Sequence, residues 1–148
     1  MRAVSEGGEH GSPTHDRVLS TAFDYARGIG RYFGSEKVCF LLYSLIRMRR
    51  PDHVIELGCG TGATAFCMAQ GLCENDNGRL LTVDNEQAWP EMAARLPLAG
   101  LGFPTGIALG DYVQRVATQL GVADRLTYHK AEVPPFPVAQ AALCLLYT

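Results

Sequence analysis

A short apolar segment that runs directly into a glycine-rich loop restricts the fold of this chain more than any other feature. Residues 54–62 read VIELGCGTG, and a helical pattern over residues 63–73 follows them. Glycine has no Cβ, so a loop of this kind can turn sharply and approach a ligand closely. The N-terminus of the next helix provides free N–H groups and the positive end of its dipole. The segment therefore predicts a strand, a ligand-binding loop and a helix in direct succession.

The residues on both sides of this loop predict a parallel sheet. Residues 53–57 and 79–84 read as short strands, with the helix over 63–73 between them. A strand, a helix and a strand within about 30 residues form a βαβ unit, in which the two strands are parallel. Residues 125–129 predict a third strand, and residues 107–120 a helix before it. We therefore expect an α/β fold.

Further patterns complete the expected order of elements. Helical spacing predicts two helices before the first strand, over residues 14–33 and 35–50. Residues 87–96 predict a short helix after the second strand, and residues 97–106, rich in Gly and Pro, predict a loop. The unbroken apolar run over residues 139–147 is typical of a buried parallel strand. The helices are expected to flank the sheet.

Composition excludes several classes of partner. The chain has 148 residues, the length of one domain. Its 13 Lys and Arg and its 15 Asp and Glu give a net charge of -2. That balance lacks the basic excess that binding to a nucleic-acid backbone usually needs. No apolar run reaches the roughly 18 residues that span a bilayer. We therefore expect neither a nucleic acid nor a membrane as the partner.

The cysteines and the first residues favour a cytoplasmic protein. The five cysteines are odd in number and form no CxxC pair, which favours reduced thiols over a disulfide framework. None of the four histidines lies at ligand spacing from a cysteine, so we expect no metal site. Residues 1–13 are polar and Gly-rich and lack the apolar core of a secretory signal. They predict a disordered tail.

Two classes of ligand fit the glycine-rich loop. Gly58, Gly60 and Ala63 match the G-x-G-x-x-G/A fingerprint of dinucleotide binding. Asp84 ends the second strand at the right spacing to accept hydrogen bonds from a ribose. S-adenosylmethionine also has a ribose, but it carries a cationic amino-acid end instead of a pyrophosphate. The glycines alone do not separate this ligand from NAD.

Glu56 favours S-adenosylmethionine. This acid lies in the apolar strand, two residues before the first glycine of the loop. Burial of a charge in such a segment costs free energy unless the charge has a partner. A carboxylate would repel a pyrophosphate, whereas the ammonium group of S-adenosylmethionine would pair with it. We therefore interpret Glu56 as the acid that serves the cationic end of the ligand.

On these residues the chain resembles the class I S-adenosylmethionine-dependent methyltransferases. Residues 56–62 (ELGCGTG) resemble motif I of that family, and residues 80–84 (LLTVD) look like its second motif, whose last acid binds the ribose. Residues 121–132 (GVADRLTYHKAE) are similar to the segment that enters the family's third strand. The resemblance covers residues 35–148 and implies a Rossmann-like parallel sheet flanked by helices. The helices before the first strand resemble those of small-molecule O-methyltransferases.

The resemblance implies the roles of the residues that bind the cofactor. Glu56 would serve the amino-acid end of S-adenosylmethionine, Asp84 its ribose and Glu132 its adenine. Glu86 competes with Asp84 for the ribose, and an ordinary surface carboxylate is the alternative for Glu132. The other expected cofactor-binding residues lie in the loop or beside these acids: Gly58, Cys59, Gly60, Thr61, Gly62, Asn85 and Ala131.

The resemblance further implies methyl transfer to an oxygen, nitrogen or carbon of a small-molecule acceptor, without identifying a catalytic base. Cys59 has no neighbouring His in the sequence, so we interpret it as a small packing residue. His129 is either a general base near the site or, as a lone histidine more often is, a structural residue. Tyr25, Tyr32 and Tyr43 either line a substrate pocket or pack in the core. An NAD-type oxidoreductase domain and a non-catalytic S-adenosylmethionine-binding or interaction module stay open as alternatives.

The family fold has further strands after the fourth, and this chain stops where the fourth should end. We expect a disordered tail over 1–13, an N-terminal helical segment over 14–50 and the cofactor-binding half of a methyltransferase domain over 51–148. The C-terminal strands of the family fold are expected to be absent, and a fragment of a longer protein is the preferred explanation. The strand over 139–147 would lie at an exposed sheet edge, which favours association between copies.

Overall fold

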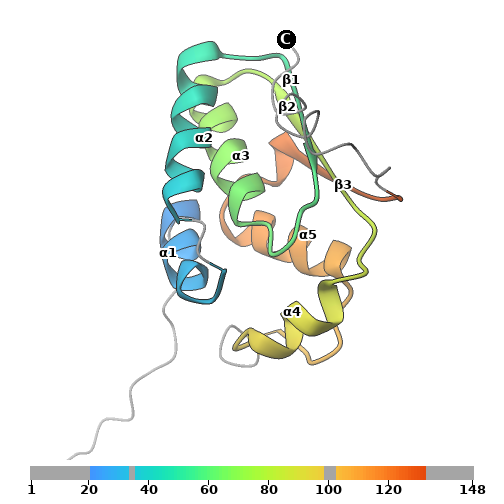
Figure 1. Ribbon diagram of the computed structural model, residues 1–148. Coiled ribbons are helices and arrows are strands. Elements are labelled where there is room, and N and C mark those ends of the chain that lie inside the picture. Colours follow the sequence, from blue (N-terminus) through green and yellow to red (C-terminus); the bar gives the residue numbers. More distant parts are fainter. Residues whose placement is uncertain (1–20, 34–35, 99–102, 133–148) are drawn as a thin grey trace, which may run out of the picture.

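The computed structural model describes residues 21–33, 36–98 and 103–132, and it shows a three-stranded parallel sheet flanked by helices (Figure 1). Two helices precede the first strand: α1 (Ala22–Phe33) and α2 (Glu36–Arg49). The βαβ unit follows as β1 (His53–Leu57), α3 (Ala63–Asn75) and β2 (Arg79–Asp84). The remaining elements are α4 (Trp89–Arg95), α5 (Leu109–Gln119), the short 3-10 helix η2 (Ala123–Arg125) and β3 (Leu126–Lys130).

This arrangement confirms the predicted fold class, an α/β fold of the Rossmann-like kind with helices before the first strand. The first two strands have the predicted bounds, and the third begins one residue later than predicted, at Leu126. The expected tail over 1–13, the expected start of the first helix at residue 14 and the expected strand over 139–147 lie outside the described residues.

The strands lie in the order β1-β2-β3, and their two faces differ in burial. On one face, Val54, Leu80 and Leu126 occupy matching positions and are buried. α3 contacts β2, α5 contacts β3, and α1 contacts both α2 and α3. Figure 1 shows α2 beside α3. On the other face, Ile55 is 48% exposed. The helices therefore bury one set of alternate strand residues more completely than the other.

None of the helices within residues 21–33, 36–98 and 103–132 is long and apolar enough to cross a membrane. The longest, α2, has 14 residues and carries basic residues in its last turn. Its Arg47 forms an ion pair with Glu74 of α3, 2.8 Å between Nη1 and Oε2.

Gly78, just before β2, lies where the βαβ unit is too closely packed for a side chain. Its φ is +82°, and a Cβ at this position would lie 2.1 Å from the carbonyl oxygen of Pro51. We expect Gly78→Ala to lower the free energy of unfolding by more than about 2 kcal/mol, since left-handed strain of about 1–2 kcal/mol adds to the clash. Urea denaturation followed by circular dichroism would measure the loss.

Gly121 provides the matched control for this prediction. Its φ is +70°, but no atom lies within 4 Å of the place where its Cβ would be. Gly121→Ala should therefore show the backbone strain alone, about 1 kcal/mol. Equal losses in the two variants would contradict the packing argument at Gly78.

Candidate functional site

The glycine-rich loop joins β1 to α3 at the carboxyl end of the sheet. Gly58, Gly60 and Gly62 have φ values of +90°, +56° and +79°, a region that L side chains rarely adopt. The Gly62 N–H donates to the carbonyl of Cys59 at 2.9 Å and closes the loop into a turn. These glycines therefore meet a conformational demand of the loop.

The three glycines differ in what surrounds them. At Gly62, a Cβ would lie 2.6 Å from the ring of Phe66, so this glycine is also required by packing. At Gly58 and Gly60, no atom lies within 4 Å of the position that a Cβ would occupy. The backbone at these two residues is open to the approach of a ligand.

Asp84 connects this loop to the end of β2. Its Oδ2 accepts a hydrogen bond from the Gly60 N–H at 3.1 Å, and its Oδ1 accepts one from the Glu86 N–H at 2.7 Å. The Gly58 N–H also donates to the carbonyl of Val83 at 2.8 Å. Each carboxylate oxygen of Asp84 keeps a second lone pair, which a hydroxyl group could use. The expected ribose-binding acid therefore lies directly beside the loop.

Glu56 lies beneath the same loop, where β1, β2 and α3 meet. Its side chain is 5% exposed. Thr64 in the first turn of α3 donates to its Oε1 at 2.5 Å, and Thr82 of β2 donates to its Oε2 at 2.6 Å. The partner that a buried carboxylate requires is therefore supplied from within the chain. No sequence motif indicated Thr64 or Thr82, although Thr82 is the residue opposite Glu56 in the β1–β2 pairing.

The charge of Glu56 is sensitive to pH near neutrality. Burial raises the pKa of Glu56 to about 7, while the hydrogen bonds from Thr64 and Thr82 lower it and the nearby Asp84 charge raises it. A cation brought close to Glu56 would favour its ionised form, and an anion would favour its protonated form. The carboxyl therefore distinguishes between ligands by the sign of their charge.

Glu86, the expected competitor of Asp84, makes different contacts. Its Oε1 accepts from the Tyr128 hydroxyl at 3.0 Å, and its Oε2 accepts from Lys130 Nζ at 2.7 Å. The hydrogen bond from Lys130 keeps the pKa of Glu86 below its ordinary value. Glu86 therefore connects the end of β2 to β3 through these hydrogen bonds. Asp84 is the acid that accepts a hydrogen bond from the glycine loop itself.

The other expected site residues divide into two groups. The Ala131 N–H donates to the Asp84 carbonyl at 3.0 Å, which places it beside the end of β2. The Asn85 Oδ1 accepts from the Gln87 N–H at 3.0 Å, so this side chain stabilises the turn that leads to α4. Glu132 is exposed and has no hydrogen bond among the described residues. The structure thus places Ala131 beside Asp84, whereas the side-chain oxygen of Asn85 is used in the turn after β2.

Cys59, Tyr25 and Tyr43 are residues for which the sequence allowed either a functional or a packing role, and the structure shows their surroundings. Cys59 is 4% exposed, and burial raises the pKa of its thiol well above the usual range, which keeps it protonated at neutral pH. Tyr25 is 1% exposed and its hydroxyl donates to the Thr61 carbonyl at 2.6 Å. The Tyr43 hydroxyl donates to Glu74. Tyr25 is therefore a core residue that also donates a hydrogen bond to the backbone of the glycine loop.

A separate cavity of about 600 Å³ lies between α4 and the segment that precedes α5. Its walls are mostly apolar, and they include Trp89, Leu98 and Ile107 but none of the expected site residues. Within residues 21–33, 36–98 and 103–132, no group of three or more His, Cys, Asp or Glu side chains is arranged to hold a metal ion. The glycine loop with its two acids is therefore the best candidate site in this part of the chain.

Comparisons with known proteins do not assign the chain to a family. No protein-family model matches the sequence, and no curated protein matches it significantly.

The buried carboxyl predicts how stability depends on pH. Because the pKa of Glu56 is about 7 in the folded chain and its ordinary value is 4.5, the folded state holds this proton more tightly than the unfolded state. The contribution of Glu56 to stability should therefore be greatest below pH 4.5 and fall by about 3 kcal/mol as the pH rises through 7. Glu56→Gln should remove this part of the pH dependence, as measured by urea denaturation between pH 4.5 and pH 8.

At the acidic end of this range the wild type carries a neutral side chain at position 56, so the two proteins should differ little there. If Glu56→Gln loses stability with pH as steeply as the wild type does, Glu56 is not the group responsible.

Proposed function

We propose that this chain binds S-adenosylmethionine at the glycine loop and serves the transfer of its methyl group to a small-molecule acceptor. One observation carries the choice of ligand. The carboxyl of Glu56 is bonded to Thr64 in the first turn of α3, at the helix end that would otherwise attract an anion. A negative charge at this position opposes a pyrophosphate and attracts the ammonium group of S-adenosylmethionine.

Each element of the site would then have a distinct role. Gly58 and Gly60 would admit the ligand to the backbone, since no atom fills the space beside them. Asp84 would accept hydrogen bonds from the ribose hydroxyls, and Glu132 would meet the adenine. Glu56 is bonded to two threonines and nearly fully buried, so it would act on the ammonium group through its charge and not by direct contact.

The ligand would supply the methyl group on a sulfonium, which is already activated toward a nucleophile. The contribution of the protein would be to hold the methyl carbon and the acceptor in line. We further propose that the protein works in the cytoplasm. The four described cysteines, Cys39, Cys59, Cys67 and Cys73, are reduced thiols, which is compatible with a reducing compartment.

The second candidate is NAD, because the spacing of Gly58, Gly60 and Ala63 also satisfies the dinucleotide fingerprint. In that case the Glu56 carboxyl would have to stay protonated beside the pyrophosphate. A third candidate, a module that binds S-adenosylmethionine without catalysis, differs from the first only in lacking turnover.

Calorimetric titration of the chain with S-adenosylhomocysteine and with NAD separates the first two candidates. We expect S-adenosylhomocysteine to bind saturably, with an affinity that rises as the pH increases through 7 and Glu56 ionises. Glu56→Gln should weaken this binding by about fivefold at pH 8, since about 1 kcal/mol of charge attraction is lost, and it should flatten the pH dependence. Asp84→Asn should weaken it at every pH.

Glu91→Gln, an exposed position on α4, provides the matched control and should leave the affinity unchanged. Binding of NAD alone, or tighter binding of S-adenosylhomocysteine by Glu56→Gln, would overturn the proposal. Formation of S-adenosylhomocysteine from S-adenosylmethionine in the presence of a set of hydroxylated and amino acceptors would then test catalysis.

A further inference from the structure

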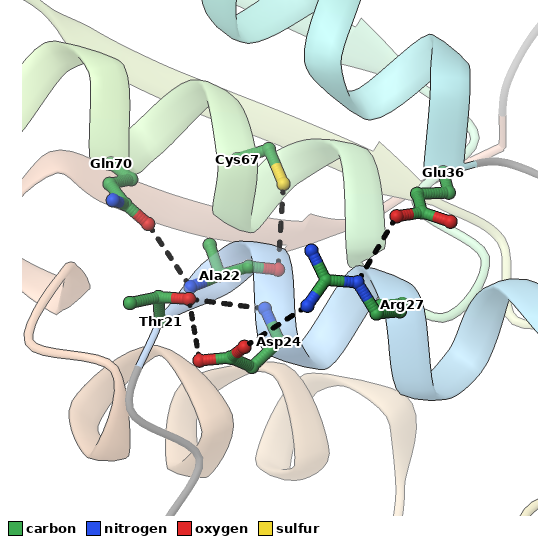
Figure 2. Close-up of polar contacts among 7 residues, drawn as sticks. All are labelled: Thr21, Ala22, Asp24, Arg27, Glu36, Cys67 and Gln70. Atoms are coloured by element: carbon green, nitrogen blue, oxygen red, sulfur yellow. Dashed lines mark hydrogen bonds and ion pairs between the residues drawn. The ribbon is translucent and has the colours of Figure 1, made fainter.

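The first turn of α1 is fixed to α3 by hydrogen bonds to the backbone of Ala22 (Figure 2). The Ala22 N–H donates to Gln70 Oε1 at 3.1 Å, and the Cys67 thiol donates to the Ala22 carbonyl at 3.6 Å. Thr21 and Asp24 cap the start of the same helix, because the Asp24 N–H donates to Thr21 Oγ1 at 3.1 Å. The place of α1 on α3 is therefore set by specific bonds as well as by packing.

One turn further along α1, Tyr25 reaches the glycine loop. Its hydroxyl donates to the Thr61 carbonyl at 2.6 Å and also contacts the hydroxyl of Tyr112 in α5. A tyrosine hydroxyl has one proton, and that of Tyr25 is used on Thr61. Tyr112 must therefore donate to Tyr25, so that a chain of hydrogen bonds runs from α5 through α1 to the loop. Burial raises the pKa of both tyrosines, that of Tyr112 to about 12, which keeps both protons in place.

These bonds fix the orientation of a single peptide group in the loop. The carbonyl of Thr61 accepts from Tyr25, and the N–H of Gly62 in the same peptide group donates to the Cys59 carbonyl. Gly62 has a φ of +79° and, as a glycine, has little steric preference of its own. Without the Tyr25 hydroxyl, the buried Thr61 carbonyl would lose its partner, and the peptide group would be held from one side only.

We propose that Tyr25 is a positioning residue for the glycine loop, and that the docking of α1 on α3 is coupled to ligand binding at this loop. The coupling is reciprocal, because a loop ordered by α1 binds more tightly and a bound ligand in turn holds α1 in place. The proposal rests on the proposed function for the identity of the ligand, whereas the effect of Tyr25 on the free loop does not depend on it.

Tyr112→Phe separates positioning from ordinary core packing. Both Tyr25→Phe and Tyr112→Phe remove one buried hydroxyl from the same cluster, and Tyr25 and Tyr112 are 1% and 0% exposed. Only Tyr25→Phe removes the donor to Thr61. A purely structural role would make the two variants alike at the loop.

Native-state amide hydrogen exchange of the ligand-free chain is the decisive measurement. In Tyr25→Phe, we expect the amides of residues 60–63 to exchange about tenfold faster than in the wild type and in Tyr112→Phe. The amides of β1 and β2 should keep the same rates in both variants, which excludes general loosening. An absence of this local rise, or an equal rise in both variants, would overturn the proposal.

A second pair of variants tests the coupling if Tyr25→Phe does not fold. Gln70→Met removes the acceptor of the Ala22 N–H on a different turn of α3 from the loop. It should raise exchange at residues 60–63 about threefold. Arg47→Met removes the ion pair between α2 and Glu74 without touching α1, and it should leave these amides unchanged. If neither variant changes them, or both do so equally, α1 does not control the loop.

S-adenosylhomocysteine then serves as the probe of reciprocity. It should slow exchange in the first turn of α1 in the wild type, and it should bind Tyr25→Phe about tenfold more weakly. If it binds the wild type but shows neither effect, the coupling is wrong. If it does not bind the wild type at all, the proposed ligand is wrong, and the exchange of the free loop still decides the role of Tyr25.

Discussion

The bonding of the buried Glu56 carboxyl determines how the strands and the helix around it can be arranged. A carboxyl at this depth is tolerated because Thr82 and Thr64 donate to its two oxygens. Thr82 is the cross-strand partner of Glu56, so a shift of one residue between β1 and β2 would turn Thr82 to the opposite face of the sheet and remove that donor. Thr64 ties the start of α3 to the same carboxyl. The loop over residues 58–62 therefore begins and ends at positions that one buried group fixes.

Much of the fold could be predicted from local signals, and the deviations have identifiable causes. The helix expected over 107–120 begins at Leu109, because the carbonyl of Ile107 accepts from the indole N–H of Trp89 at 2.7 Å instead of starting the helix. The helix expected over 87–96 is restricted to Trp89–Arg95. Glu86, just before it, has a left-handed φ of +62°, which a helical pattern does not reveal. Both differences arise from contacts or conformations that periodicity does not encode.

The site could be predicted only where its residues belong to a local motif or end a predicted strand. The glycines, Glu56 and Asp84 follow from a motif and from the ends of two strands. The pairing of Glu56 with Thr82 required the register of β1 and β2, and the bond from Tyr25 to Thr61 joins residues that are 36 positions apart. The principle that a buried charge needs a partner was correct, but the partners are two threonines of the chain, whereas the sequence had suggested a ligand.

The packing of Trp89 gives the molecule a spectroscopic property. Trp89 is the single tryptophan of the chain, and its indole is 5% exposed. Its ring lies against that of Tyr112, with 4.9 Å between the ring centroids, and Tyr112 is the residue whose hydroxyl begins the path to the glycine loop. Intrinsic tryptophan fluorescence therefore comes from one defined place, which two residues, Tyr112 and Tyr25, connect to that loop. The chain carries its own optical probe of the region where α4, α5 and α1 meet, without any attached label.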